Sequence, residues 1–166
     1  MNPRMYEDFQ PGQVFAHRDS KTITEEDNRL FCRLTCNPHP LHTDEEYARD
    51  TRFGKRVVVG TFVLSLAVGL SVSDVSLGAI VNVGYDEVCH HAPVFIGDTL
   101  SVSSTVIDKW PSRSGKAQGM VQVLTTACNQ HGKGVLTFSR TVLLPCREKP
   151  EKPEKQEKVR ESAPTA

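Results

Sequence analysis

The segment Asn37 to His42, which reads Asn-Pro-His-Pro-Leu-His, carries the side chains best suited to acid–base chemistry in this chain. An imidazole ordinarily titrates near neutral pH, so His42 can accept a proton and return it. Gly60 opens a long apolar stretch that is predicted to be helical. A backbone N–H at the first turn of a helix has no intrahelical acceptor and favours negative charge. We therefore predict a general acid/base, His42, and an oxyanion-binding amide, Gly60.

Each residue of this candidate site also has a purely structural interpretation. His42 could be a loop histidine bonded to backbone, and Gly60 could serve only close packing. The carboxamide of Asn37 can hold a water molecule but cannot take up a proton at neutral pH, and it could instead form an Asx turn before Pro38. His39 either supplements the base, contacts the substrate or stacks within the loop.

A metal site is the other chemistry that these residue types suggest. Cys32, Cys36, His39 and His42 follow a Cys-x3-Cys-x2-His-x2-His spacing. Structural zinc usually draws on paired ligand knuckles, and the prolines give this run no such form. Cys32 is better explained as a small core residue, and the run 89–91 (Cys-His-His) as the surface of a strand at a sheet edge. We predict no metal site.

Basic residues gather after the active-site segment, at Arg52, Lys55 and Arg56. Arg52 and Arg56 are candidates for binding the phosphates of a substrate, although a solvated basic face is the simpler alternative. The chain has no Gly-x-Gly-x-x-Gly, P-loop or Gly-x-Ser-x-Gly motif. We therefore expect neither a nucleotide cofactor nor a serine nucleophile.

Composition narrows the class of protein further. The 20 basic and 20 acidic side chains of the 166 residues balance, so no global field attracts nucleic acid or an anionic membrane. No stretch reaches the roughly 18 apolar residues that a membrane span needs. The N-terminus lacks the apolar region of a signal peptide, so we expect five reduced cysteines and a cytoplasmic protein.

The helices and strands that must position these residues predict an α+β fold. We expect a strand at 12–17, and a helix that starts at Thr24 with Leu30, Phe31 and Leu34 on its apolar face. A short helix at 44–49 and a largely buried helix at 60–73 follow. Alternating residues then predict antiparallel strands around 100–106, 121–125 and 135–139, separated by turns. The sheet should curl round the apolar helix.

One folded domain accounts for residues 5–146. Residues 147–166 mix Lys, Glu and Pro with almost no apolar side chains. Such a segment cannot bury enough surface to offset its ordering entropy, so we predict a disordered charged tail.

The order of these elements resembles the hot-dog fold, and the motifs resemble those of MaoC-like, R-specific enoyl-CoA hydratases and dehydratases. That family carries Asp-x-Asn-Pro-x-His, a short acidic helix, Phe-Gly and a glycine that opens the central helix. Here the matching positions are residues 37–42, 44–48, 53–54 and 59–60. A second similar segment is 92–100 (Ala-Pro-Val-Phe-Ile-Gly-Asp-Thr-Leu).

The resemblance implies a cofactor-independent hydro-lyase that adds water to a trans-2-enoyl thioester or removes it from the 3-hydroxyacyl product. It assigns His42, Asn37 and Gly60 to catalysis, with CoA or acyl carrier protein as the thioester carrier. The family's Asp falls on Asn37 and its Asn falls on His39. This variant is similar to members that hydrate branched dicarboxylic enoyl-CoAs such as mesaconyl- or itaconyl-CoA. The family also implies a homodimer or a larger even assembly.

Two other functions fit the same fold. A thioesterase would need a carboxylate base, for which Glu25, Glu26 and Asp44 are available. A non-catalytic acyl-thioester-binding subunit would explain Asn37 in place of an acid.

Overall fold

The computed structural model describes residues 3–114 and 116–147. The helical elements are η1 (Tyr6–Asp8), α1 (Glu25–Leu34), α2 (Pro40–Thr43), α3 (Glu45–Arg49), α4 (Gly60–Ser71) and the π-helical turn η2 (Val72–Ser76). The strands are β1 (Val14–Ala16), β2 (Lys21–Thr22), β3 (Val81–His90), β4 (Thr99–Pro111), β5 (Gln118–Cys128) and β6 (Gly134–Pro145). No helix in the described ranges is long and apolar enough to cross a membrane.

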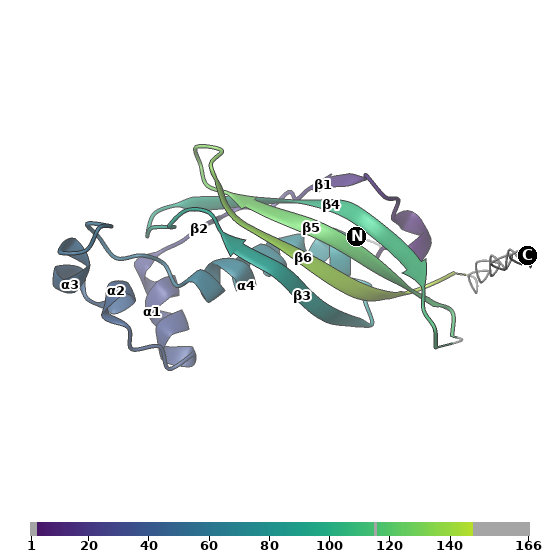
Figure 1. Ribbon diagram of the computed structural model, residues 1–166, viewed down its shortest axis with the longest axis horizontal. Coiled ribbons are helices and arrows are strands. Elements are labelled where there is room, and N and C mark those ends of the chain that lie inside the picture. Colours follow the sequence, from purple (N-terminus) through teal and green to yellow (C-terminus); the bar gives the residue numbers. More distant parts are fainter. Residues whose placement is uncertain (1–2, 115, 148–166) are drawn as a thin grey trace, which may run out of the picture.

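An antiparallel sheet in the order β1-β4-β5-β6-β3 forms the body of the molecule, with β2 paired to β4 (Figure 1). Strands β4, β5 and β6 pair consecutively, as the alternating residues predict. Strand β3 does not pair with β4, its successor in the chain, but crosses to the far edge and pairs with β6. Alternation did not define β3 because nearly all of its residues are exposed.

Helix α4 lies against the sheet, and α1, α2 and α3 gather at one end of the molecule (Figure 1). Val63 and Ala67 of α4 pack into a core that includes Leu100, Leu136 and Phe138. The prediction of a largely buried helix was only partly right. The sheet covers one face, on which Val63, Ala67 and Ser71 are buried, whereas the remaining residues of α4 are half-buried or exposed.

Helix α1 begins where the sequence predicts. Thr24 accepts a hydrogen bond from the Asp27 N–H, and Asp27 accepts one from the Thr24 N–H, which completes a capping box. The predicted apolar face was only partly right, since Phe31 is half-buried and stacks on Phe62 of α4. Leu30 and Leu34 are 44% and 73% exposed, and the buried residues are Asn28 and Cys32. Two hydrogen bonds of Asn28, described below, decide which face of α1 turns inward.

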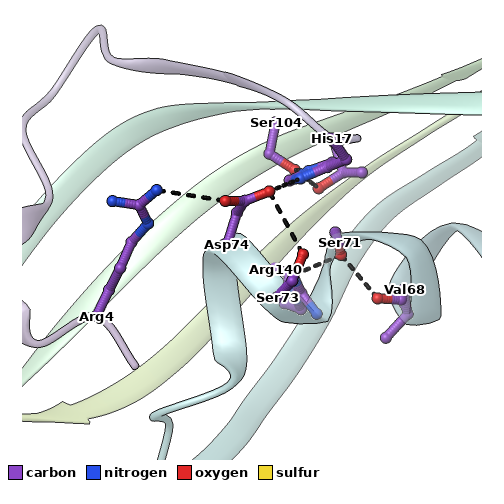
Figure 2. Close-up of polar contacts among 9 residues, drawn as sticks. Arg4, His17, Val68, Ser71, Ser73, Asp74, Ser104 and Arg140 are labelled. Carbon is purple, nitrogen blue, oxygen red and sulfur yellow. Dashed lines mark hydrogen bonds and ion pairs between the residues drawn. The ribbon is translucent and has the colours of Figure 1, made fainter. Parts of the chain in front are cut away.

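A buried polar network joins the first strand, the turn after α4 and the sheet (Figure 2). The His17 Nδ1 lies 2.9 Å from Asp74 Oδ2, and its Nε2 lies 2.9 Å from Ser104 Oγ. Arg4 also pairs with Asp74, at 3.3 Å. Ser104 is 1% exposed, so this Ser-His-Asp arrangement has no access for a substrate and is structural.

The predicted tail lies outside the described residues except for Arg147. The Arg147 Nη2 donates to both carboxylate oxygens of Asp8 at 2.8 Å, and its backbone N–H donates to Glu7. Arg147 therefore packs against η1 and belongs to the folded part of the chain.

Candidate active site

His42 lies in α2, a short helix that begins inside the Asn37–His42 segment and that the sequence analysis did not anticipate. Its Nδ1 lies 2.7 Å from the backbone carbonyl of Val57. A carbonyl oxygen can only accept, so Nδ1 must carry the hydrogen. The other ring nitrogen, Nε2, is then a free acceptor in the neutral imidazole. This contact fixes both the orientation and the tautomer that a general base requires.

His42 and Gly60 line the same cavity, whose volume is about 310 Å³. The cavity lies where α2, the segment before α4 and the end of β3 meet. Its lining residues are His42, Arg52, Phe53, Val57, Val58, Gly60, Val63, His90, His91, Ala92, Pro93 and Val94. In the described part of the chain, no Asp or Glu lines it. The cavity thus has basic and apolar walls.

Gly60 is the first residue of α4, and Val59 before it provides no side-chain cap. The Gly60 N–H has no hydrogen-bond acceptor among the described residues, as is usual in the first turn of a helix. A Cβ atom on Gly60 would lie 3.1 Å from both Cε1 and Nε2 of His90. The imidazole of His90 thus packs directly on Gly60, which makes His90 a site residue that sequence analysis missed.

Asn37 and His39 do not line the cavity of His42. Asn37 borders a second cavity of about 440 Å³ with residues of α1, and its Oδ1 accepts a hydrogen bond from the His39 N–H at 3.1 Å. His39 in turn accepts a hydrogen bond from the Leu41 N–H through Nδ1 and caps α2. The structure thus gives Asn37 the local turn contact that was its alternative interpretation, and gives His39 a capping role that the sequence analysis did not consider.

The two arginines predicted to bind substrate differ. Arg52 is exposed and lines the cavity. Arg56 does not line it, because its guanidinium is held by Glu45 at 2.7 Å and Glu25 at 3.1 Å. The hydrogen bonds that the guanidinium donates to Glu25 and, to a smaller extent, to Glu45 raise the pKa of Arg56 above its usual value. Arg56 therefore joins the N-terminal turns of α1 and α3, and the prediction that it binds substrate gains no support here.

The Cys32–His42 run does not assemble as a metal site. Within residues 3–114 and 116–147, no three His, Cys, Asp or Glu side chains gather closely enough to hold an ion. Cys32 is buried, as expected for a small core residue, and burial raises the pKa of its thiol.

An antiparallel sheet packed on one apolar helix, with a histidine loop at that helix's N-terminus, defines a hot-dog domain. A protein of Mycobacterium tuberculosis described as having a double hot-dog fold superimposes with a TM-score of 0.80 at 21% identity, over 98% of this chain and 52% of that one. The model of the MaoC like domain matches residues 8–128. The chain belongs to this family, as its motifs predicted.

Two curated relatives of similar sequence identity differ in how much of their length this chain covers. A mesaconyl-CoA hydratase of Cereibacter sphaeroides is 35% identical over 145 residues, which are 87% of this chain and 42% of the relative. An (R)-specific enoyl-CoA hydratase of Rhodospirillum rubrum is 34% identical over 146 residues, which are 86% of this chain and 92% of the relative. The chain thus spans less than half the length of the first relative and nearly the whole length of the second.

Proposed function

We propose that this chain is a cofactor-independent hydro-lyase that adds water to a trans-2-enoyl-CoA or removes it from the 3-hydroxyacyl-CoA. One observation carries this proposal. The Val57 carbonyl holds His42 in the tautomer whose Nε2 is a free acceptor, in the cavity that also contains the N-terminus of α4. The names of both curated relatives agree with it.

The reaction follows from these two groups. His42 Nε2 takes a proton from water while the water oxygen bonds to C3 of the enoyl group. The electron pair of the C2–C3 double bond moves toward the thioester, and the Gly60 N–H binds the oxygen that becomes enolate-like. The imidazolium of His42 then returns the proton to C2. Addition of H and OH is balanced without any other reactant, and one oxyanion donor is worth about 3 kcal/mol of barrier.

We propose a dicarboxylic acyl group as the substrate, in the class of mesaconyl-CoA. The cavity contains Arg52, His90 and His91 and, among its described lining residues, no carboxylate. A free carboxylate on the acyl chain is favoured by these basic side chains, and no acidic side chain among the lining residues would repel it. Arg52 at the exposed rim is equally placed for a phosphate of CoA, so substrates with and without the extra carboxylate separate the two roles.

We propose that the active form is a homodimer in a reducing compartment such as the cytoplasm. Strand β3 is an open sheet edge. Its exposed apolar residues, together with Ile80 directly before it, form a patch, the β3 patch: Ile80, Val81, Val83, Tyr85 and Val88. An open apolar edge of this length favours pairing with another strand. The double hot-dog relative, almost twice as long as the matched part, carries two such folds in one chain. All five cysteines are free thiols.

Turnover of a panel of enoyl-CoAs tests the proposed activity. Crotonyl-, mesaconyl- and itaconyl-CoA are compared by the loss of enoyl absorbance. We expect turnover by the wild type, fastest with a dicarboxylic substrate, and a loss of at least about a hundredfold in His42→Ala, since a general acid/base is removed. His131→Ala removes an exposed histidine of the β5–β6 turn and should retain wild-type activity.

Two results would reject the hydro-lyase. Release of free CoA thiol without loss of enoyl absorbance would identify a thioesterase. Tight binding of enoyl-CoA without turnover, unchanged in His42→Ala, would identify a non-catalytic binding subunit.

A further inference from the structure

Helix α1 is polar along most of its length, yet it turns the side chain of Asn28 completely into the protein. Asn28 is 0% exposed. Its Nδ2 donates to the backbone carbonyl of His42 at 3.1 Å, and its Oδ1 accepts from the backbone N–H of Val59 at 3.1 Å. Both functions of the carboxamide are therefore satisfied by backbone groups of other segments.

These two backbone groups belong to the two halves of the proposed active site. His42 carries the base, and Val59 is the residue directly before Gly60. One rigid, planar amide group thus joins the base to the helix N-terminus. The halves are also joined by the Val57 N–H to the Leu41 carbonyl at 3.2 Å, so the loop retains an anchor without Asn28.

We propose that Asn28 is a positioning residue of the active site, which sets the separation of His42 from the Gly60 amide. This inference rests on the proposed hydro-lyase function. The site requires a residue with one donor and one acceptor in one plane, which among side chains of this size only asparagine supplies at neutral pH. An aspartate would place a second acceptor against the His42 carbonyl, and a leucine would leave two buried backbone groups without partners.

Turnover of three variants tests the proposal. Asn28→Leu should lower kcat/KM by roughly tenfold to a hundredfold, mainly in kcat, because the base is displaced relative to the oxyanion donor. Thr125→Val is the matched control, since Thr125 is equally buried and gives up one hydrogen bond, to Ser104 in the sheet. It should lose stability with little change in kcat. If the two variants lost the same amount of kcat at the same loss of melting temperature, Asn28 would have only a structural role.

Asn28→Asp adds a readout that a merely structural role would not move. A protonated carboxyl group has the shape of the carboxamide and can donate to the His42 carbonyl while accepting from Val59. The ratio of variant to wild-type kcat/KM should therefore rise as the pH falls, while the ratio for Asn28→Leu stays flat. Dividing by the wild type removes the titration of His42 itself. A flat ratio for Asn28→Asp would overturn the proposal.

NMR of the free protein separates this inference from the proposed function. In Asn28→Leu the amide signal of Gly60 and the ring signals of His42 should shift or broaden, and in Thr125→Val they should match the wild type. Unchanged signals in Asn28→Leu overturn the positioning role even if the wild type is a hydratase. Changed signals together with a wild type that turns over no enoyl-CoA overturn the hydratase while preserving the geometric link.

Discussion

Position 60 requires glycine because of a neighbouring side chain, and not because of its backbone φ angle. It is absent from the glycines with positive φ, whereas Gly54, a few residues before it, has a φ of 69°. The imidazole of His90 occupies the space that a Cβ atom would enter. The glycine at the proposed oxyanion site is therefore a consequence of packing between α4 and the end of β3.

This close approach makes a prediction for Gly60→Ala. The added methyl group keeps the N–H but pushes the His90 ring by a few tenths of an ångström, so we expect kcat/KM to fall by about tenfold. In a His90→Ala background the same methyl group meets no ring, and its effect should nearly vanish. The four proteins form a double-mutant cycle measured with the best enoyl-CoA. Equal losses in both backgrounds would show that the ring is not what constrains position 60.

At the scale of the elements, Asp74 links the turn after α4 to β1 and the N-terminal segment. Hydrogen bonds from His17 and then Arg4 lower the pKa of Asp74 below its ordinary value of 3.8. A carboxyl group with a lowered folded-state pKa stabilises the fold above its ordinary pKa. That contribution is lost as the pH falls toward and through the folded-state value.

Asp74→Asn should therefore destabilise the protein in a pH-dependent way. We expect a loss of roughly 1–2 kcal/mol at pH 7, typical for a hydrogen bond to a charged group that is partly open to solvent. The difference in melting temperature from the wild type should shrink as the pH is lowered from about 5 to 3. Thermal unfolding at several pH values measures it. A difference that is constant over this range would mean that the charge of Asp74 contributes nothing.

At the scale of the whole molecule, the two edges of the sheet differ. The β1 edge is three residues long, whereas β3 has ten residues and carries the β3 patch. The apolar residues of α4 outside its core face are only half-buried, which leaves a second, partly exposed apolar area. Both features suit burial against a second copy.

Introducing a charge at each sheet edge directly tests which edge forms the dimer. Val83→Lys places a lysine in the β3 patch, where Val83 is 53% exposed, and should convert the dimer to a monomer. Val14→Lys makes the same change on the β1 edge, at 63% exposure, and should leave the dimer intact. Light scattering after size exclusion reports the mass against 18.4 kDa for one chain. A wild type of monomer mass contradicts the proposed dimer.

The capped start of α1, the helix opened by Gly60 and the β4–β6 meander were all predictable, because each depends on local signals: a capping box, apolar spacing and alternation. The meeting of His42 and Gly60 at one cavity was predictable from the family motif, which both positions match in order. The strand edge at residues 89–91 was anticipated, but the full extent of β3 was not, because an edge strand with two exposed faces leaves no alternating pattern. The contact of His90 with Gly60 was not predictable either, because it depends on how β3 packs against α4. Arg56 was misjudged because a basic cluster in sequence does not reveal its carboxylate partners.

The sequence by itself determined the family, the hot-dog architecture and the identity of the candidate base, since these are written in the order and spacing of local motifs. Only the tertiary structure decided which residues surround that base. It brought His90 onto Gly60 and buried Asn28 between His42 and Val59. The physical reason is that these contacts join segments far apart in the chain, and a hydrogen-bond partner or a steric neighbour across such a distance is fixed by packing of the whole domain.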